Sequence, residues 1–135
     1  MKRLCRHFYK KEKGFTLVEL MIVIIILAVL TGIAIPSYMA LRNRARESAT
    51  EVEMKNIATA LELYMADKEE YPATLAITDY MNPVPANDSW GNAYVYAQTG
   101  SGTGYTLTSK GVDGAVAGDD DIVFTNGQMT SIGAY

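Results

Sequence analysis

A long uninterrupted apolar segment near the start of the chain limits its possible folds more than any other feature. It runs from Leu20 to Leu30 as LMIVIIILAVL, and TGIAI extends it to Ile35. Counted from Phe15, the segment would rise roughly 30 Å as an α-helix, about the hydrocarbon thickness of a bilayer. A buried strand would suit its Ile and Val residues, but the run is too long for one. The segment therefore predicts a membrane-spanning helix.

Charge is distributed unevenly around this segment. Up to Gly14 the chain has six basic residues and one acidic residue, a net charge of +5. Residues 15–135 have six basic and fourteen acidic residues, a net charge of −8. The basic residues before the segment outnumber Arg42, Arg44 and Arg46 after it, which predicts a cytoplasmic N-terminus. The acidic remainder argues against nucleic-acid binding, because phosphate neutralisation requires Lys and Arg on the folded surface.

The single cysteine and the single histidine exclude several classes of enzyme. Cys5 cannot form an internal disulfide framework or a four-thiolate zinc site, and His7 lies only two residues away. If the N-terminal segment is removed, the remaining chain has neither residue type. That excludes a Cys–His dyad, a Ser–His–Asp triad and a histidine-ligated transition metal. The sequence therefore predicts a protein that is not an enzyme.

A secretory signal peptide is the first alternative for the apolar segment. Its hydrophobic core would be shorter, and small residues would mark a cleavage site after it. No such pattern follows Ile35, which favours a retained membrane helix.

Glu19 is an unexpected residue at the start of an apolar helix. A carboxylate near the middle of a membrane helix costs on the order of 2.5–3.5 kcal/mol, and somewhat less near the interface. One interpretation is an interfacial side chain that reaches water. The other requires a buried cation: a cut between Gly14 and Phe15 would create an α-amino group four residues before Glu19. The amine of one subunit would then pair with Glu19 of the next subunit in a helical array.

The same residues resemble a known processing motif. The segment KGFTLVE at 13–19 resembles the cleavage motif of type IV pilins and type II secretion pseudopilins, in which an apolar helix follows at once. The resemblance implies that a prepilin peptidase cuts after Gly14 and methylates the new N-terminal amine of Phe15. It also implies that Glu19 and Pro36 act in assembly, and that the leader is discarded together with its cysteine and histidine.

An amphipathic helical segment is predicted after the apolar run. Pro36 removes one helical hydrogen bond and should bend or loosen the helix, which Tyr71-Pro72 should close. Apolar residues that recur at mostly three- to four-residue steps predict one buried face. These residues are Tyr38, Leu41, Ala45, Ala49, Val52, Ile57, Leu61 and Tyr64. Together the two segments predict one helix of roughly 80 Å from Phe15 to about Glu70.

The polar face of this helix carries many charges, and two interpretations of it stay open. Its charged residues are Arg42, Arg44, Arg46, Glu47, Glu51, Glu53, Lys55 and Glu62. They would either contact neighbouring subunits or form a solvated surface.

Short strands joined by turns are predicted for the C-terminal part. The strand candidates are Ala93–Tyr96, Tyr105–Ser109, Ile122–Thr125 and Gln128–Ile132. Asn126-Gly127 is a type I′ hairpin signal, and the glycine-rich segment 100–104 is interpreted as a hairpin turn because no helix or Lys-Ser/Thr follows it. The predicted fold class is α+β, and by resemblance a type IV pilin-like fold. The predicted parts are a leader (1–14), a membrane half-helix (15–36) and a globular domain (37–135), itself divided into helix (37–70), loop (71–92) and sheet with acidic loop (93–135).

An acidic segment between the second and third strand candidates is the strongest candidate for chemistry. It contains Asp113 and the run Asp119, Asp120 and Asp121. Adjacent carboxylates repel one another, and a hard divalent cation with oxygen ligands, most naturally Ca²⁺, would relieve that repulsion. The spacing is not that of an EF-hand. A solvated acidic turn is one alternative, and a carboxylate hydrolase, which would need an enclosed pocket, is another.

This segment also resembles the C-terminal loop of the major (G-type) pseudopilin of type II secretion systems. The matching positions are Ser109, Gly111, Asp113, Gly114, Asp120, Asp121 and Ile122. Residues 88–92, DSWGN, are similar to the family's Asp-Pro-Trp-Gly-Asn, with Ser89 in place of proline. The resemblance implies Ca²⁺ bound by Asp113, Asp120 and Asp121, together with backbone carbonyls.

The resemblance implies a structural function in a filament. Subunits would sit in the bacterial inner membrane with the globular domain in the periplasm, and would form a homo-oligomeric filament that pushes cargo outward. The implied partners are prepilin peptidase, an inner-membrane platform with its ATPase, and minor pseudopilins.

Two other functions remain open. A type IV pilus subunit for adhesion, motility or surface electron transfer is the first, because Ser89, the hairpin at 98–104 and the extension at 126–135 depart from the secretion family. The second is a membrane-tethered binding module that does not polymerise.

Overall fold

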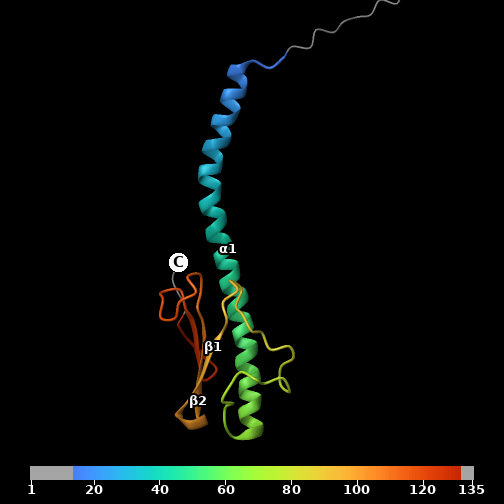
Figure 1. The fold of residues 1–135 in the computed structure, drawn as a ribbon, viewed down its shortest axis with the longest axis vertical. Coiled ribbons are helices and arrows are strands. Elements are labelled where there is room, and N and C mark those ends of the chain that lie inside the picture. The colour runs from blue at the N-terminus through green and yellow to red at the C-terminus, as the bar shows by residue number, and fades with distance from the viewer. Residues whose placement is uncertain (1–13, 132–135) are drawn as a thin grey trace, which may run out of the picture. The chain divides into compact units, whose positions relative to one another are not determined.

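The computed structural model describes residues 14–131, which form one long helix and one small antiparallel sheet (Figure 1). Helix α1 (Leu17–Lys68) continues through Pro36 without interruption, close to the bounds that the sequence predicts. The chain forms two compact units that divide between Ser37 and Tyr38. The fold class predicted from the sequence, α+β, is confirmed.

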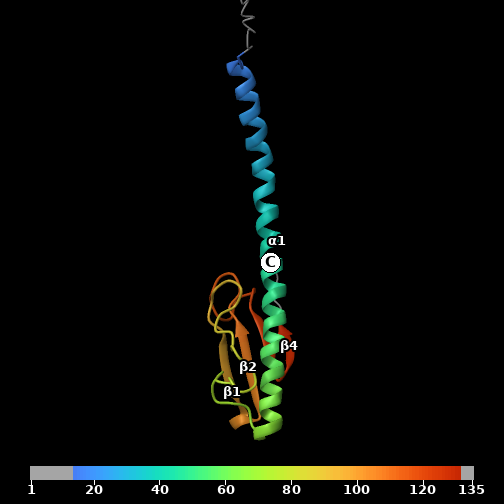
Figure 2. The ribbon, with the colours of Figure 1, turned by 90° about the vertical axis from the view of Figure 1, so that its right-hand side faces the viewer.

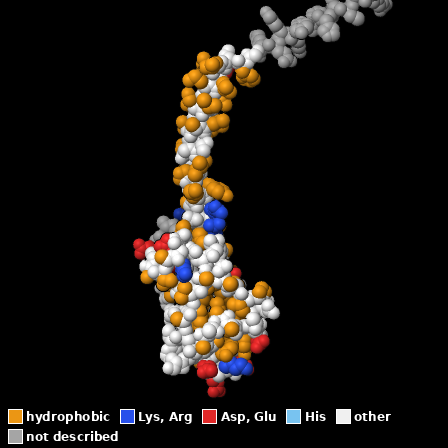
Figure 3. All heavy atoms as spheres, viewed as in Figure 1, with side chains coloured by type: hydrophobic (Ala, Val, Ile, Leu, Met, Phe, Trp, Pro, Cys, Tyr) orange, Lys and Arg blue, Asp and Glu red, His pale blue; other side chains and the backbone are white. Residues whose placement is uncertain are grey.

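The part of α1 that belongs to the first unit has apolar side chains on all its faces. Ile24, Ile25 and Leu27 are each 55% exposed in the isolated chain. A helix of this kind is stable only when lipid or other protein covers it. Its 18-residue window reaches a mean hydropathy of 2.9, so by length and composition it can cross a membrane. Figure 3 shows these hydrophobic side chains around the helix.

The sheet is a four-stranded meander in the order β1-β2-β3-β4 (Figure 2). The strands are β1 (Val95–Thr99), β2 (Gly104–Ser109), β3 (Ile122–Thr125) and β4 (Gln128–Ser131), all antiparallel to their neighbours. The turn at Asn126-Gly127 has positive φ at both residues, as a type I′ hairpin requires. Gly100–Gly102 forms a 3₁₀ turn between β1 and β2. Each predicted strand overlaps an observed one, and both predicted turns are confirmed, but the first strand begins two residues later and ends three residues later than predicted. The last residue predicted for the fourth strand, Ile132, lies outside the described residues.

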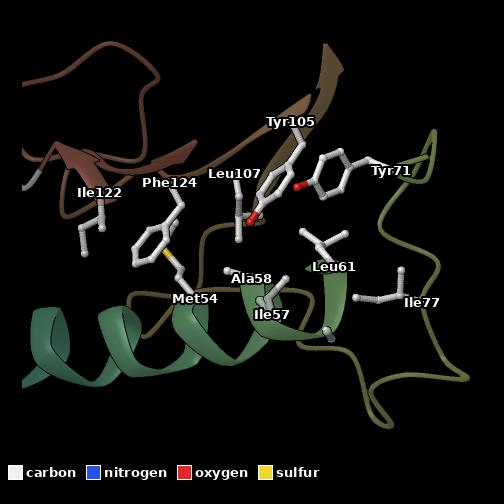
Figure 4. Close-up of a cluster of buried hydrophobic side chains, with 11 residues drawn as sticks. Met54, Ile57, Ala58, Leu61, Tyr71, Ile77, Tyr105, Leu107, Ile122 and Phe124 are labelled. Atoms are coloured by element: carbon white, nitrogen blue, oxygen red, sulfur yellow. The ribbon is translucent and has the colours of Figure 1, made fainter. Parts of the chain in front are cut away.

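The core of the second unit lies between α1 and the sheet (Figure 4). Its buried hydrophobic side chains are Met54, Ile57, Ala58, Ala60, Leu61, Tyr71, Ile77, Tyr105, Leu107, Ile122 and Phe124. The helical members repeat at three- and four-residue steps, and the β2 members alternate, because these periods place side chains on one face. Each fully buried Leu, Ile or Phe stabilises the unit by roughly 1.5–3 kcal/mol.

The helix face that packs on the sheet differs from the face predicted by the sequence. Ile57 and Leu61 are buried as predicted, but Leu41 and Val52 are more than half exposed. Met54, which was not in the predicted set, is fully buried. Two residues advance a helix by about 200°, so Met54 and Val52 face opposite sides. The prediction for the early part of this face was wrong for two reasons. Leu41 precedes the first buried residue of α1, Thr50, and Val52 faces away from the core.

Candidate functional site

The start of α1 carries the predicted processing site. Gly14 has open space around its Cα, and the side chain of Phe15 is 92% exposed. The predicted cleavage point therefore lies in an accessible stretch directly before the helix. The rest of the predicted leader, residues 1–13, lies outside the described residues.

Glu19 takes part in a capping box at this end of the helix. The Thr16 backbone N–H and hydroxyl donate to Glu19 Oε2 at 2.8 and 2.9 Å, and the Glu19 N–H donates to the Thr16 hydroxyl at 3.2 Å. The reciprocal bonds satisfy backbone donors that the first helical turn would otherwise leave unpaired. Our sequence reasoning missed this role, although the spacing Thr-x-x-Glu is its known signature. Glu19 Oε1 makes no hydrogen bond within residues 14–131 and is free for another donor.

The acidic loop is the connection between β2 and β3, residues 110–121. Backbone amides hold one oxygen of each of the three carboxylates predicted as ligands. Asp113 Oδ1 accepts from the Ala115 N–H at 2.8 Å. Asp120 Oδ2 accepts from the N–H groups of residues 112 and 113, and Asp121 Oδ2 accepts from those of residues 117 and 118. The loop is thus folded around its own acidic side chains.

The second oxygen of each of these carboxylates accepts no hydrogen bond from a backbone amide within residues 14–131. Asp121 is only 6% exposed, and its Oδ1 is buried without a hydrogen-bond partner. Asp120 Oδ1 and Asp113 Oδ2 lie 2.8 and 3.1 Å from the point where a Cβ on Gly118 would stand. Hard carboxylate oxygens of this kind suit Ca²⁺, which also accepts backbone carbonyls and water as ligands.

The carboxylates of Asp113, Asp120 and Asp121 do not converge on one metal-binding position. Within residues 14–131, no group of three or more Asp, Glu, His or Cys side chains converges closely enough to hold a metal ion. The structure places Asp113 and Asp120 beside Gly118 and leaves Asp121 deeper in the loop. The remaining aspartate of the run, Asp119, is exposed.

A turn at residues 88–92 supports the first residues of the acidic loop. Asp88 is 6% exposed; its Oδ2 accepts from the Ser109 hydroxyl at 2.7 Å, and its Oδ1 accepts from the N–H groups of Trp90 and Asn92 at 3.0 and 2.8 Å. The Asn92 side-chain amide donates to the Gly111 carbonyl at 2.8 Å. The motif at 88–92 was recognised from the sequence, but its contact with the acidic loop was not. No pattern in the sequence indicates that positions 88 and 109 lie close together.

Ser89, the departure from the family motif, has a physical explanation here. Its N–H donates to the Thr50 hydroxyl at 3.2 Å, and Thr50 is fully buried on α1. Proline has no N–H and would lose this bond. The substitution therefore replaces a stiffer turn with a hydrogen bond to the helix.

Two family models match the chain. "Prokaryotic N-terminal methylation motif" matches residues 9–35, and "Type II secretion system (T2SS), protein G" matches residues 75–125. The type II secretion system core protein G of Pseudomonas aeruginosa is 32% identical over 130 residues, which cover 83% of this chain and 92% of that protein. This chain belongs to the type II secretion system protein G family. The protein of the same name from Escherichia coli K12 is also 32% identical, with 83% and 90% covered.

A pilin is also similar to this protein G family member. The type IV major pilin protein PilA of Myxococcus xanthus is 33% identical over 89 residues, which cover 66% of this chain and 38% of PilA. No solved structure matches the chain significantly. The resemblance stated from the sequence is confirmed: the methylation motif covers the segment from Gly14 to Glu19, and the protein G model covers the turn at 88–92 and the acidic loop.

Proposed function

We propose that this chain is the major structural subunit of a type II secretion pseudopilus, a filament that polymerises from the membrane and pushes cargo outward. The observation that carries the proposal is the apolar part of α1 up to Ser37. It is exposed on all faces of the isolated chain, and nearly all of it lies within the match to the methylation motif at residues 9–35. Apolar surface of this kind favours lipid before assembly and other copies of the same helix afterwards. The protein is anchored in a membrane by this helix, and we place it in the inner membrane with a cytoplasmic N-terminus, as the basic leader favours.

We propose that Glu19 sets the register between subunits. After cleavage, the amine of Phe15 on one subunit would donate to Glu19 of its neighbour, for which Oε1 is free. A buried ion pair fixes geometry more than it adds stability, so it suits a register function. The remaining proposed partners are the prepilin peptidase, the platform with its ATPase, and minor pseudopilins.

Processing is tested by intact-mass analysis of the membrane-bound protein. We expect a chain that begins at a methylated Phe15, and we expect Gly14→Glu to leave the leader attached. A mature chain that begins at unmodified Met1 would overturn the proposal. Assembly is then tested by recovery of filaments from cells that express the whole secretion system, where Glu19→Ala should abolish them.

We also propose that the acidic loop binds Ca²⁺. The fit rests on the buried, unpaired Asp121 Oδ1 and on the two carboxylate oxygens beside Gly118. Bound Ca²⁺ would supply positive charge that lets these carboxylates approach one another. The residues that would hold it are Asp113, Asp120 and Asp121, and the hydrogen bonds to backbone amides already orient all three side chains.

Thermal melting of residues 38–135, with Ca²⁺ and with chelator, tests this site. A ligand at 100 times its Kd stabilises the folded state by about 2.7 kcal/mol, which shifts the Tm by several degrees. Asp121→Asn should remove the shift. Asp119→Asn is the matched control, because Asp119 is exposed and lies in the same run, and it should keep most of the shift. Equal melting temperatures with Ca²⁺ and chelator would contradict the site.

A type IV pilus subunit is the second candidate function, and the similarity to PilA favours it. Deletion of the gene separates the two. Loss of protein secretion with unchanged surface pili supports the pseudopilus, whereas loss of surface pili with normal secretion supports the pilus.

A further inference from the structure

The second unit carries opposite charges near the two ends of its part of α1. Arg42, Arg44 and Arg46 lie at the beginning, and all three are exposed or half-buried. Glu69 and Glu70 directly follow the end of the helix at Lys68 and are exposed. Figure 3 shows a group of basic side chains where the helix enters the globular part, and acidic side chains together with a basic group at the opposite end.

These charges have no partners among the described residues, 14–131. Among residues 14–131 the only ion pairs are Lys55–Glu51 and Lys68–Asp67. The three arginines and the two glutamates of this inference make no side-chain hydrogen bond or ion pair there. Both sets are therefore free to meet a partner outside the chain.

Glu69 and Glu70 lie at a position where a negative charge does not stabilise the helix. The C-terminus of a helix carries a partial negative charge, and an acidic side chain there is unfavourable by roughly 0.3–1 kcal/mol. Lys68 is the only basic residue of the last turn. The negative charges of Glu69 and Glu70 therefore do not stabilise this end of the helix.

We propose that the basic segment (Arg42, Arg44, Arg46) of one copy docks head to tail on the acidic helix end (Glu69, Glu70) of a second copy. The inference rests on the proposed filament function and assigns it a contact between globular domains. Arg44 and Lys68 are separated by 24 residues of helix, roughly 36 Å, so the two sets cannot meet within one copy. Because two different surfaces meet, a docked pair still has one free basic segment and one free acidic helix end. Further copies can dock on both, so the contact continues as an open filament.

Several other acidic side chains are less suitable partners for the arginines. Asp113, Asp120 and Asp121 of the acidic loop accept hydrogen bonds from backbone amides of the loop itself. Asp67 accepts from the Tyr80 hydroxyl and pairs with Lys68. The side chains of Glu69 and Glu70 make no such bond within residues 14–131, so on docking they lose only their hydration.

Charge reversal in the full-length protein, expressed with its secretion system, tests the contact. The basic-end variant is Arg42→Glu/Arg44→Glu/Arg46→Glu, and the acidic-end variant is Glu69→Arg/Glu70→Arg. Each variant alone brings like charges together, and we expect filament yield to fall by about tenfold or more. Expressed together, the two variants can alternate along a filament, because acidic ends then meet basic ends, and the yield should recover. Lys55→Glu, midway along the same helix, is the control and should assemble normally.

Disulfide cross-linking gives an independent measurement that does not depend on charge reversal. Arg44→Cys with Glu69→Cys, in a Cys5→Ser background, should yield a ladder of multimers on oxidation of filaments, whereas Lys55→Cys with Glu69→Cys should not. Filaments that form normally from either reversal variant, or cross-linking that gives no ladder, would overturn the contact. Failure of co-expression to restore assembly would also overturn it, because the two charge sets would then not meet each other. If the wild-type chain forms no filament at all, the proposed function itself fails.

Discussion

Asp88 offers a sharp test of how the globular domain is held together. Its buried carboxylate accepts three hydrogen bonds, from the Ser109 hydroxyl and from two backbone amides of its own turn. A hydrogen bond to a charged group is worth roughly 1.5–3 kcal/mol, but removing the side chain also removes the cost of burying a charge. We therefore expect Asp88→Ala to lower the free energy of unfolding by about 3–5 kcal/mol. Ser109→Ala should lower it by about 1–2 kcal/mol.

Urea denaturation of residues 38–135 in the presence of chelator measures both effects without any contribution from metal. The double variant should lose less than the two single losses together, by about 1–2 kcal/mol, because both substitutions break the same bond. Asp79→Ala, at an exposed position, is the control and should stay within about 0.5 kcal/mol of the wild type. A loss under about 1 kcal/mol for Asp88→Ala, or strict additivity with Ser109→Ala, would refute the reasoning.

Three further predictions concern the same domain. Gly111→Ala should lower the free energy of unfolding, measured in urea, by about 1–3 kcal/mol or more, because φ is +60° and a Cβ would lie 2.3 Å from a backbone carbonyl oxygen. Gly91→Ala is the control and should lower it less, because φ is +95° but the space around the Cα is open. Leu61→Ala should cost about 2–5 kcal/mol in the same measurement, and a smaller loss would contradict the packing of α1 on the sheet. Burial raises the pKa of Tyr96 and Tyr105 to about 12, above the value of about 10 in the unfolded chain, so their contribution to stability is complete below pH 10 and is lost as the pH approaches 12. Tyrosinate absorbance and ellipticity should then change together, and ionisation of all tyrosines near pH 10 in a folded chain would contradict it.

The fold could be predicted from the sequence because its signals are local. The apolar run, the strand candidate Tyr105–Ser109 and the Asn126-Gly127 turn each depend on a few adjacent residues, and each is confirmed. The Thr16–Glu19 capping box could equally have been predicted from its spacing. It was missed because Glu19 was considered only as an interfacial side chain or as a partner for another subunit.

The long-range features could not be predicted in the same way. The exposure of Val52 depends on which side of the helix the core covers, which no local pattern reports. The bond between Asp88 and Ser109 joins positions 21 residues apart, and only the folded domain brings them together. Repulsion in the acidic loop was foreseen, but its backbone amide bonds depend on the detailed path of the loop.

The order of the sheet has a consequence for how the domain folds. Every strand pairs with its neighbour in sequence, so each pairing closes a short loop at a small cost in chain entropy. Contacts of this local kind are associated with fast folding. The longest connection within the sheet is the acidic loop of residues 110–121, which makes the joining of β2 and β3 the most demanding step. If the chain crosses a membrane before it folds, each hairpin can form soon after its two strands have emerged. The time at which the hairpin of β3 and β4 pairs with β2 then depends on the acidic loop.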